Sequence, residues 1–145
     1  MTPSIYQQRC RSAATSLAAQ AAWPAAVVAL GLGAPASLRP NGVLAVTGLF
    51  AALIVLGFSI HLAFDAWLFR LMAEHPDESS GGRAVDEILT RLRLKGRPKE
   101  GPDAVRGLSD RLNGTQRIVR RQRLALAAFA VLALVAAMQE FSKGA

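Results

Sequence analysis

Cysteine is almost absent from this 145-residue chain, which has only Cys10. A lone cysteine excludes an intrachain disulfide and a zinc site built from several cysteines. Histidine is nearly as scarce, with His61 and His75 alone. A haem held by two histidines of one chain would need both, and His75 lies outside the apolar segment that contains His61. We therefore expect no metal and no cofactor.

Aromatic residues make up 6% of the chain, and none lies in the basic stretch between residues 70 and 123. Proteins that bind single-stranded nucleic acid stack bases on aromatic side chains inside a basic groove. Acidic residues are also interleaved with the basic ones in this stretch, so we do not expect a nucleic-acid partner. The chain lacks a phosphate-binding glycine loop, a nucleophile elbow and paired carboxylates in polar surroundings. These absences predict a protein that is not an enzyme.

The most informative segment is long and apolar. Residues 43–69 contain only two ionisable side chains, His61 and Asp65. About 20 residues of helix cross a hydrocarbon core of about 30 Å. Aromatic residues and then Arg70 close the segment, as is typical of the headgroup level of a membrane. A buried helix of a soluble domain would need more covering protein than so short a chain provides. We predict a transmembrane helix over residues 43–70.

An alanine-rich apolar segment over residues 12–38 precedes this helix. It is either a first transmembrane helix or a signal peptide with an A-x-A cleavage pattern at residues 34–36. Its apolar region is long for a signal peptide, so we expect a retained helix. Small residues four positions apart let transmembrane helices pack closely. The candidate packing residues are Ala18, Ala22 and Ala26 in this segment and Gly48 and Ala52 in the next.

A third apolar block follows at residues 124–139. It is short for a span, but Arg123 directly before it can reach the membrane interface with its long side chain. We predict a third transmembrane helix here, with residues 140–145 as a short tail.

Between the second and third spans lies a basic loop, residues 71–123. With Arg70 it carries 13 Lys and Arg against 8 Asp and Glu, which is +5 of the net charge of +7. Helical spacing of apolar residues predicts amphipathic helices at about residues 84–95 and 103–121, with a flexible polar break at residues 77–82. Two such short helices cannot build a core of their own. We therefore expect lipid, another protein or each other to cover their apolar faces.

Orientation follows from the distribution of the basic residues. Cytoplasmic segments of membrane proteins are enriched in Lys and Arg. Residues 1–11 and the loop at 71–123 are both basic, and three spans put both on one side. We predict a cytoplasmic N terminus and an external C terminus in a bacterial inner membrane. The basic run before the third span either contacts anionic lipid or a partner, or serves only as a topology signal. Its members are Arg117, Arg120, Arg121 and Arg123.

Together these features predict an all-α integral membrane protein with three transmembrane helices and a short amphipathic helical pair in a cytoplasmic loop. We expect a non-enzymatic accessory or structural subunit of a larger membrane complex, with membrane lipids and a larger membrane protein or further copies of itself as partners. The alternative is a small oligomeric transporter or channel. His61 and Asp65, four residues apart on one helix face, would then line its polar path. A self-assembling, lesion-forming protein is a third possibility.

Overall fold

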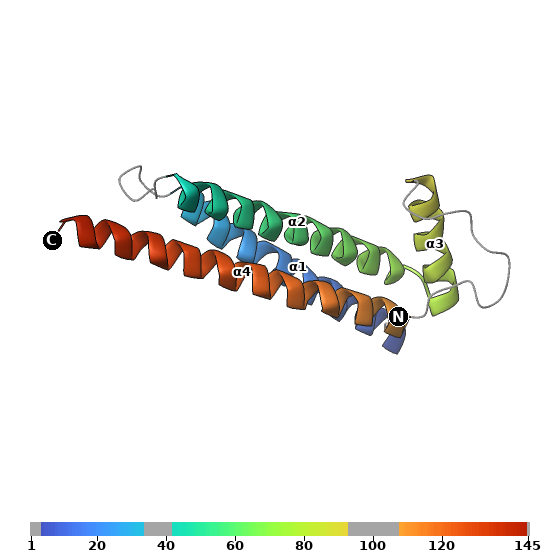
Figure 1. Cartoon of the computed structure of the whole chain (residues 1–145). Helices are drawn as coiled ribbons and strands as arrows, with labels where there is room; N and C mark the ends of the chain where they lie inside the picture. Colours follow the sequence, from blue (N-terminus) through green and yellow to red (C-terminus); the bar gives the residue numbers. More distant parts are fainter. Residues whose placement is uncertain (1–3, 34–41, 93–107, 145) are drawn as a thin grey trace. The chain divides into compact units, whose positions relative to one another are not determined.

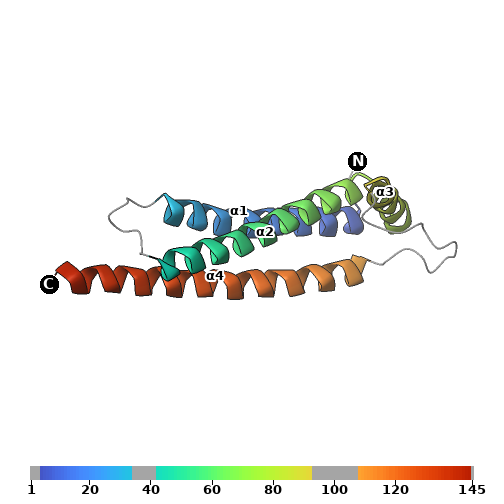
Figure 2. The ribbon, with the colours of Figure 1, turned by 45° about the horizontal axis from the view of Figure 1, so that its top comes forward.

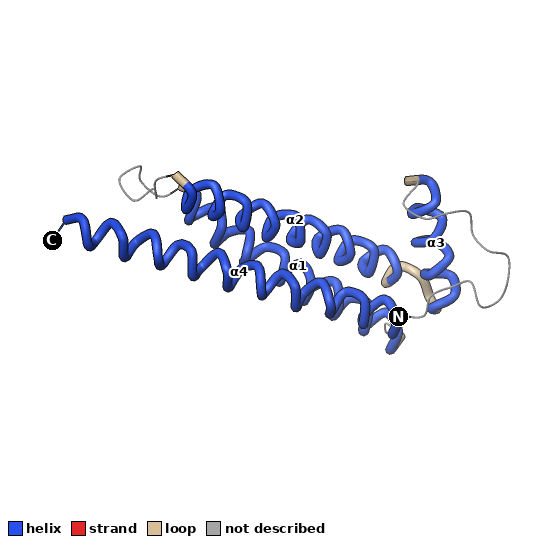
Figure 3. Tube along the Cα trace, in the orientation of Figure 1, coloured by secondary structure: helices blue, strands red, loops and turns tan. Residues whose placement is uncertain are grey.

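The computed structural model describes residues 4–33, 42–92 and 108–144, and this part of the chain is all-helical (Figure 1). Its helices are α1 (Ile5–Leu32), α2 (Val43–Met72), α3 (Glu78–Arg91) and α4 (Leu108–Gly144). Of the described residues, 92% are helical and none forms a strand, as the tube in Figure 3 also shows. The helices α1, α2 and α4 are each long and apolar enough to cross a membrane.

The first helix begins earlier than the sequence analysis predicted, at Ile5 rather than at residue 12. The reason is a capping box formed by Ser4 and Gln7. The Ser4 hydroxyl accepts the backbone N–H of Gln7, and the Gln7 side-chain oxygen accepts the backbone N–H of Ser4. This exchange satisfies amide groups that a helix start otherwise leaves without partners. Residues 34–38, the end of the predicted segment, lie outside the described residues.

The second helix matches its predicted start and extends two residues beyond the predicted end, to Met72. Gly42 precedes it with a φ of 59°, a left-handed conformation that glycine adopts without steric cost. This helix is the most apolar of the three candidate spans, with a mean hydropathy of 2.5 over its most apolar 18 residues.

The third helix corrects the predicted flexible break at residues 77–82. Helix α3 starts at Glu78 with Asp77 as its N-cap, and it ends at Arg91 instead of residue 95. The Asp77 carboxylate accepts the Ser79 hydroxyl at 2.6 Å and the Ser80 backbone N–H at 2.8 Å. These hydrogen bonds hold the pKa of Asp77 below its usual range. The two glycines that predicted flexibility, Gly81 and Gly82, are buried instead. A Cβ on Gly81 would collide with the Tyr6 hydroxyl, so the absence of a side chain allows this close approach.

The fourth helix corrects the predicted division between a loop helix at about 103–121 and a span at 124–139. Both belong to one continuous helix, Leu108–Gly144. The change from basic to apolar side chains near residue 123 alters polarity but not backbone conformation. Arginine, leucine and alanine are all good helix formers, and no proline lies within this helix. The predicted helix start at residues 103–107 lies outside the described residues.

The described residues fall into two compact units. Unit 1 consists of Met1–Ala19 and Ala63–Arg117, and unit 2 of Gln20–Leu62 and Ile118–Ala145. In unit 1, α3 lies beside the last turns of α2 and the first turns of α1 in both views (Figure 1, Figure 2). In unit 2, a small apolar core joins α1, α2 and α4. Its buried members are Val28, Ala52, Val55 and Phe129.

Burial along the long helices recurs at heptad intervals, which is the spacing of coiled-coil packing. Each long helix therefore buries one narrow seam of side chains and leaves most of its surface exposed. On α4 the buried positions are seven residues apart: Leu108, Thr115, Gln122, Phe129 and Ala136. On α1 and α2 they alternate between three and four residues apart, and they include Cys10, Ala14, Leu17 and Ala21 on α1 and Val55, Ser59, Leu62 and Ala66 on α2.

Candidate functional site

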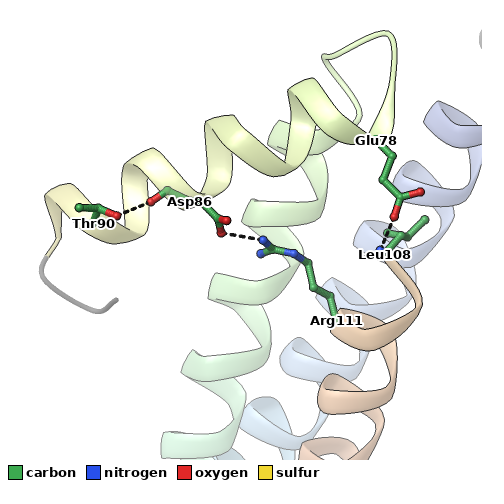
Figure 4. A network of polar contacts seen from close by, with 5 residues as sticks. All are labelled: Glu78, Asp86, Thr90, Leu108 and Arg111. Carbon is green, nitrogen blue, oxygen red and sulfur yellow. Dashed lines mark hydrogen bonds and ion pairs between the residues drawn. The ribbon is translucent and has the colours of Figure 1, made fainter. Parts of the chain in front are cut away.

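An ion pair joins α3 to α4 within unit 1. A side-chain nitrogen of Arg111 lies 2.8 Å from a carboxylate oxygen of Asp86, and the two side chains are only 14% and 12% exposed. Figure 4 shows the two side chains extended toward each other from neighbouring helices. Removing either side chain of this pair would be costly, because the remaining charge would stay buried without its partner.

The same two helices are connected again at the start of α4. The backbone N–H of Leu108, the first residue of this helix, donates a hydrogen bond to the carboxylate of Glu78 (Figure 4). A carboxylate is favourable there because the first turn of a helix has unpaired N–H groups and a partial positive charge. Glu78 thus caps a helix that begins 30 residues later in the chain. Both of these polar contacts hold the beginning of α4 against α3.

Asp65, one half of the predicted intramembrane pair, is half-buried in unit 1. Its carboxylate accepts the hydroxyl of Thr115 on α4 at 3.1 Å. The same hydroxyl also lies within hydrogen-bond distance of the Arg111 carbonyl oxygen, at 3.0 Å. Thr115 itself is buried. Asp65 therefore takes part in a polar contact between α2 and α4.

His61, the other half of the pair, belongs to unit 2 and is exposed. It lines a shallow depression of about 420 Å³ on the surface of α2 and α4. The other lining residues are the apolar Ile54, Gly57, Phe58 and Ile118. The imidazole is thus the polar group of an otherwise apolar surface.

A buried hydrogen bond in unit 2 involves two residues that the sequence analysis did not select. The side-chain amide of Gln122 donates to the hydroxyl of Ser59 at 2.9 Å, and the two residues are 2% and 5% exposed. In an apolar environment such a bond fixes the register of two helices. The sequence signal for the burial of Gln122 was its position seven residues after Thr115 and seven before Phe129, in the series of buried positions on α4.

The predicted helix-packing residues divide into two groups. Ala52 is fully buried in the unit 2 core, and Gly48 is half-buried with open space where a Cβ would lie. Ala18, Ala22 and Ala26 are exposed, because α1 turns its other face to α2 and α4. Their role in packing against another chain stays a prediction.

The predicted basic run on α4 is exposed throughout. Arg117 belongs to unit 1 and Arg120, Arg121 and Arg123 to unit 2. These four arginine side chains are open to their surroundings.

Among the residues described, no group of three or more His, Cys, Asp and Glu side chains lies close enough to hold a metal ion. Comparison of the chain with protein-family models, curated proteins and solved structures finds no match.

Proposed function

We propose that this chain is a non-enzymatic integral membrane protein that serves as an accessory or structural subunit of a larger membrane complex. The observation that carries the proposal is the exposed apolar surface of its three long helices. In the most apolar window of each, only 17% to 28% of the residues are buried. Large side chains such as Leu30, Ile60 and Val131 are 60% to 78% exposed. A surface of this extent needs lipid or another protein to cover it.

The α1 helix supports a protein partner more than a lipid environment. The mean hydropathy of its most apolar 18 residues, 1.4, is the lowest of the three candidate spans, and its exposed face carries Ala18, Ala22 and Ala26. Alanine gains little from contact with lipid tails, which are as apolar as it is. Small side chains instead let the backbone of a second helix approach closely, and this packing drives association in membranes. We therefore assign the partner contact to this face.

We place the protein in a bacterial inner membrane with its N terminus, α3 and the first turns of α4 in the cytoplasm and its C terminus outside. The positive-inside rule supports this orientation. The hydrogen bond between Gln122 and Ser59 puts the end of the predicted loop, near residue 122, beside the apolar part of α2 instead. The exposed Arg117, Arg120, Arg121 and Arg123 then contact anionic headgroups or the cytoplasmic part of the partner. Helix α3 and the start of α4 form the cytoplasmic helical pair.

The proposal is tested by purifying a C-terminally tagged copy in mild detergent. We expect a stoichiometric larger membrane protein to accompany it. Ala22→Leu should reduce the recovered partner at unchanged expression, because leucine blocks close approach of a second helix. The matched control is Ala45→Leu, which enlarges an exposed alanine on α2 and should leave the partner bound. A fully functional lone monomer would contradict the proposal.

A small oligomeric transporter or channel is the second candidate, and the placement of His61 favours it. This imidazole lines an apolar depression on the exposed surface of unit 2. A second copy packed there would enclose it within the membrane, where ionisable groups mark transport paths. In this case His61→Ala and Asp65→Asn abolish a pH-dependent flux in reconstituted vesicles. If the protein is an accessory subunit, the same changes only loosen assembly.

A further inference from the structure

A hollow of about 400 Å³ lies between α1 and α2 within unit 1. Two buried alanines, Ala14 and Ala73, leave this space because their side chains end at the Cβ atom. Its volume falls within the range of about 300–1,000 Å³ that is usual for small-molecule sites. The remaining lining residues are Arg11 and Thr15 of α1 and Arg70 and Glu74 of α2.

The polar groups of the hollow favour an anion. Arg11 and Arg70 are both exposed, and the ion pairs formed among the described residues involve neither of them. The Thr15 hydroxyl is already directed to its own helix, within 3.1 Å of the Arg11 carbonyl oxygen. The free donors are therefore two guanidinium groups from different helices. Guanidinium binds phosphate oxygens in pairs of parallel hydrogen bonds.

The position of the hollow along α2 relates it to the membrane interface. Trp67 lies three residues before Arg70 and is 47% exposed. Tryptophan followed by arginine is typical of the headgroup level of a span. A phosphate bound between the two helices at this level would belong to a lipid whose acyl chains run along the exposed apolar faces of α1 and α2.

We propose that this hollow binds the headgroup of an anionic phospholipid. Arg11 and Arg70 hold its phosphate, and the Glu74 carboxylate accepts a hydroxyl group of the headgroup. With two cations and one carboxylate, the site carries one net positive charge and matches a singly charged lipid such as phosphatidylglycerol. The site differs from the basic run on α4. The lipid site in the hollow rests on the proposed membrane insertion of α1 and α2 but not on the identity of any protein partner.

The test is native mass spectrometry of the purified full chain, titrated in detergent with phosphatidylglycerol. Arg11→Gln and Arg70→Gln should each weaken lipid binding about tenfold, since each removes a charge-assisted hydrogen bond. The matched control is Arg9→Gln, which removes another exposed charge two residues away on α1, outside the hollow. It should change the apparent Kd less than twofold. Ala73→Leu, which fills the hollow without changing charge, should also abolish binding, with helix content checked by circular dichroism.

Two further titrations identify the source of the phosphate and the role of Glu74. Inorganic phosphate at millimolar concentration should not displace the lipid, because the acyl chains contribute to its binding. Glu74→Gln should reduce the preference for phosphatidylglycerol over an anionic lipid without headgroup hydroxyls. Equal binding by wild type, Arg11→Gln and Arg70→Gln would overturn the proposal, as would an equal loss in Arg9→Gln or displacement by free phosphate. Recovery of the chain outside the membrane fraction would instead show that the proposed membrane insertion is wrong.

Discussion

The ion pair between Asp86 and Arg111 should govern how firmly α3 is held on α4. Breaking a buried ion pair costs about 3–5 kcal/mol, because the remaining charge stays buried without its partner. These side chains retain 12% and 14% exposure, so we expect a coupling energy of about 2 kcal/mol, below the fully buried range. For the local opening of α3, this amounts to about a thirtyfold change in its equilibrium constant.

The coupling is measured by a double-mutant cycle with Asp86→Ala, Arg111→Ala and the double variant. The readout is hydrogen exchange of the α3 backbone amides, which reports local opening of a helix without global unfolding. The cycle isolates the pair because each single change removes the same interaction. Exchange of α3 should accelerate in both single variants, and the double variant should be little worse than either.

A matched control lies on the same helix. Glu87 and Arg91 form an ion pair of 2.7 Å, but their side chains are 63% and 77% exposed. Exposed pairs of this kind contribute about 0.3–0.5 kcal/mol on a helix. The same cycle on Glu87 and Arg91 should therefore give a coupling several times smaller. Equal couplings for the two pairs would refute the argument that burial makes the Asp86–Arg111 contact strong.

Three further predictions concern helix packing and capping. Gln122→Leu combined with Ser59→Ala should give a coupling of about 0.6 kcal/mol and at most about 1.7 kcal/mol in detergent unfolding cycles, the average and the largest values for hydrogen bonds between membrane helices. A coupling of zero would contradict a formed bond. Gly31→Leu should lower the midpoint of thermal unfolding, because even a Cβ at this position would lie 3.0 Å from a ring carbon of Phe129. Gly48→Leu meets open space and should leave the midpoint unchanged. Equal midpoints for the two variants would count against the packing of Gly31 on Phe129. Asp77 has a lowered pKa, so its cap is fully formed above the usual carboxyl range and is lost as the pH falls through that lowered value. Asp77→Asn, which does not titrate, should remove this acid transition from the amide NMR signals of α3, and its persistence would refute the assignment to this carboxylate.

The sequence predicted three apolar helical segments because their signal is length and uninterrupted apolar character. The start of α2 at Val43 is confirmed, since a glycine-containing turn precedes a strongly apolar run. The start of α1 was predictable as well. Ser4 and Gln7 have the spacing of a capping box, but the polarity of the first eleven residues obscured it.

Two errors arose from using polarity to place helix boundaries. The Gly-rich residues 77–82 were predicted to be flexible. Gly81 is instead needed where α3 approaches Tyr6, and local sequence does not encode this tertiary contact. The division of α4 near residue 123 placed a helix end where only the polarity changes. No glycine or proline stops the helix there.

The polar contacts between helices were beyond prediction for a different reason. Asp86 and Arg111 are 25 residues apart, and Ser59 and Gln122 are 63 apart. Periodicity identifies which residues share a helix face, but it does not say which faces meet. In so alanine-rich a chain, the heptad seam on α1 is also hard to separate from rows that arise by composition, and the predicted row of Ala18, Ala22 and Ala26 lies on the exposed side.

Membrane insertion with three crossings is the central claim, and cysteine labelling tests it most directly. In a Cys10→Ala background, single cysteines replace Ser4 and Ser142, which are exposed near the two ends of the described chain. An impermeant maleimide is added to intact spheroplasts and then to permeabilised ones. We predict that the cysteine at position 142 reacts from outside and that the one at position 4 reacts only after permeabilisation. Labelling of both from the same side, or release of the protein by an alkaline wash, would contradict the account.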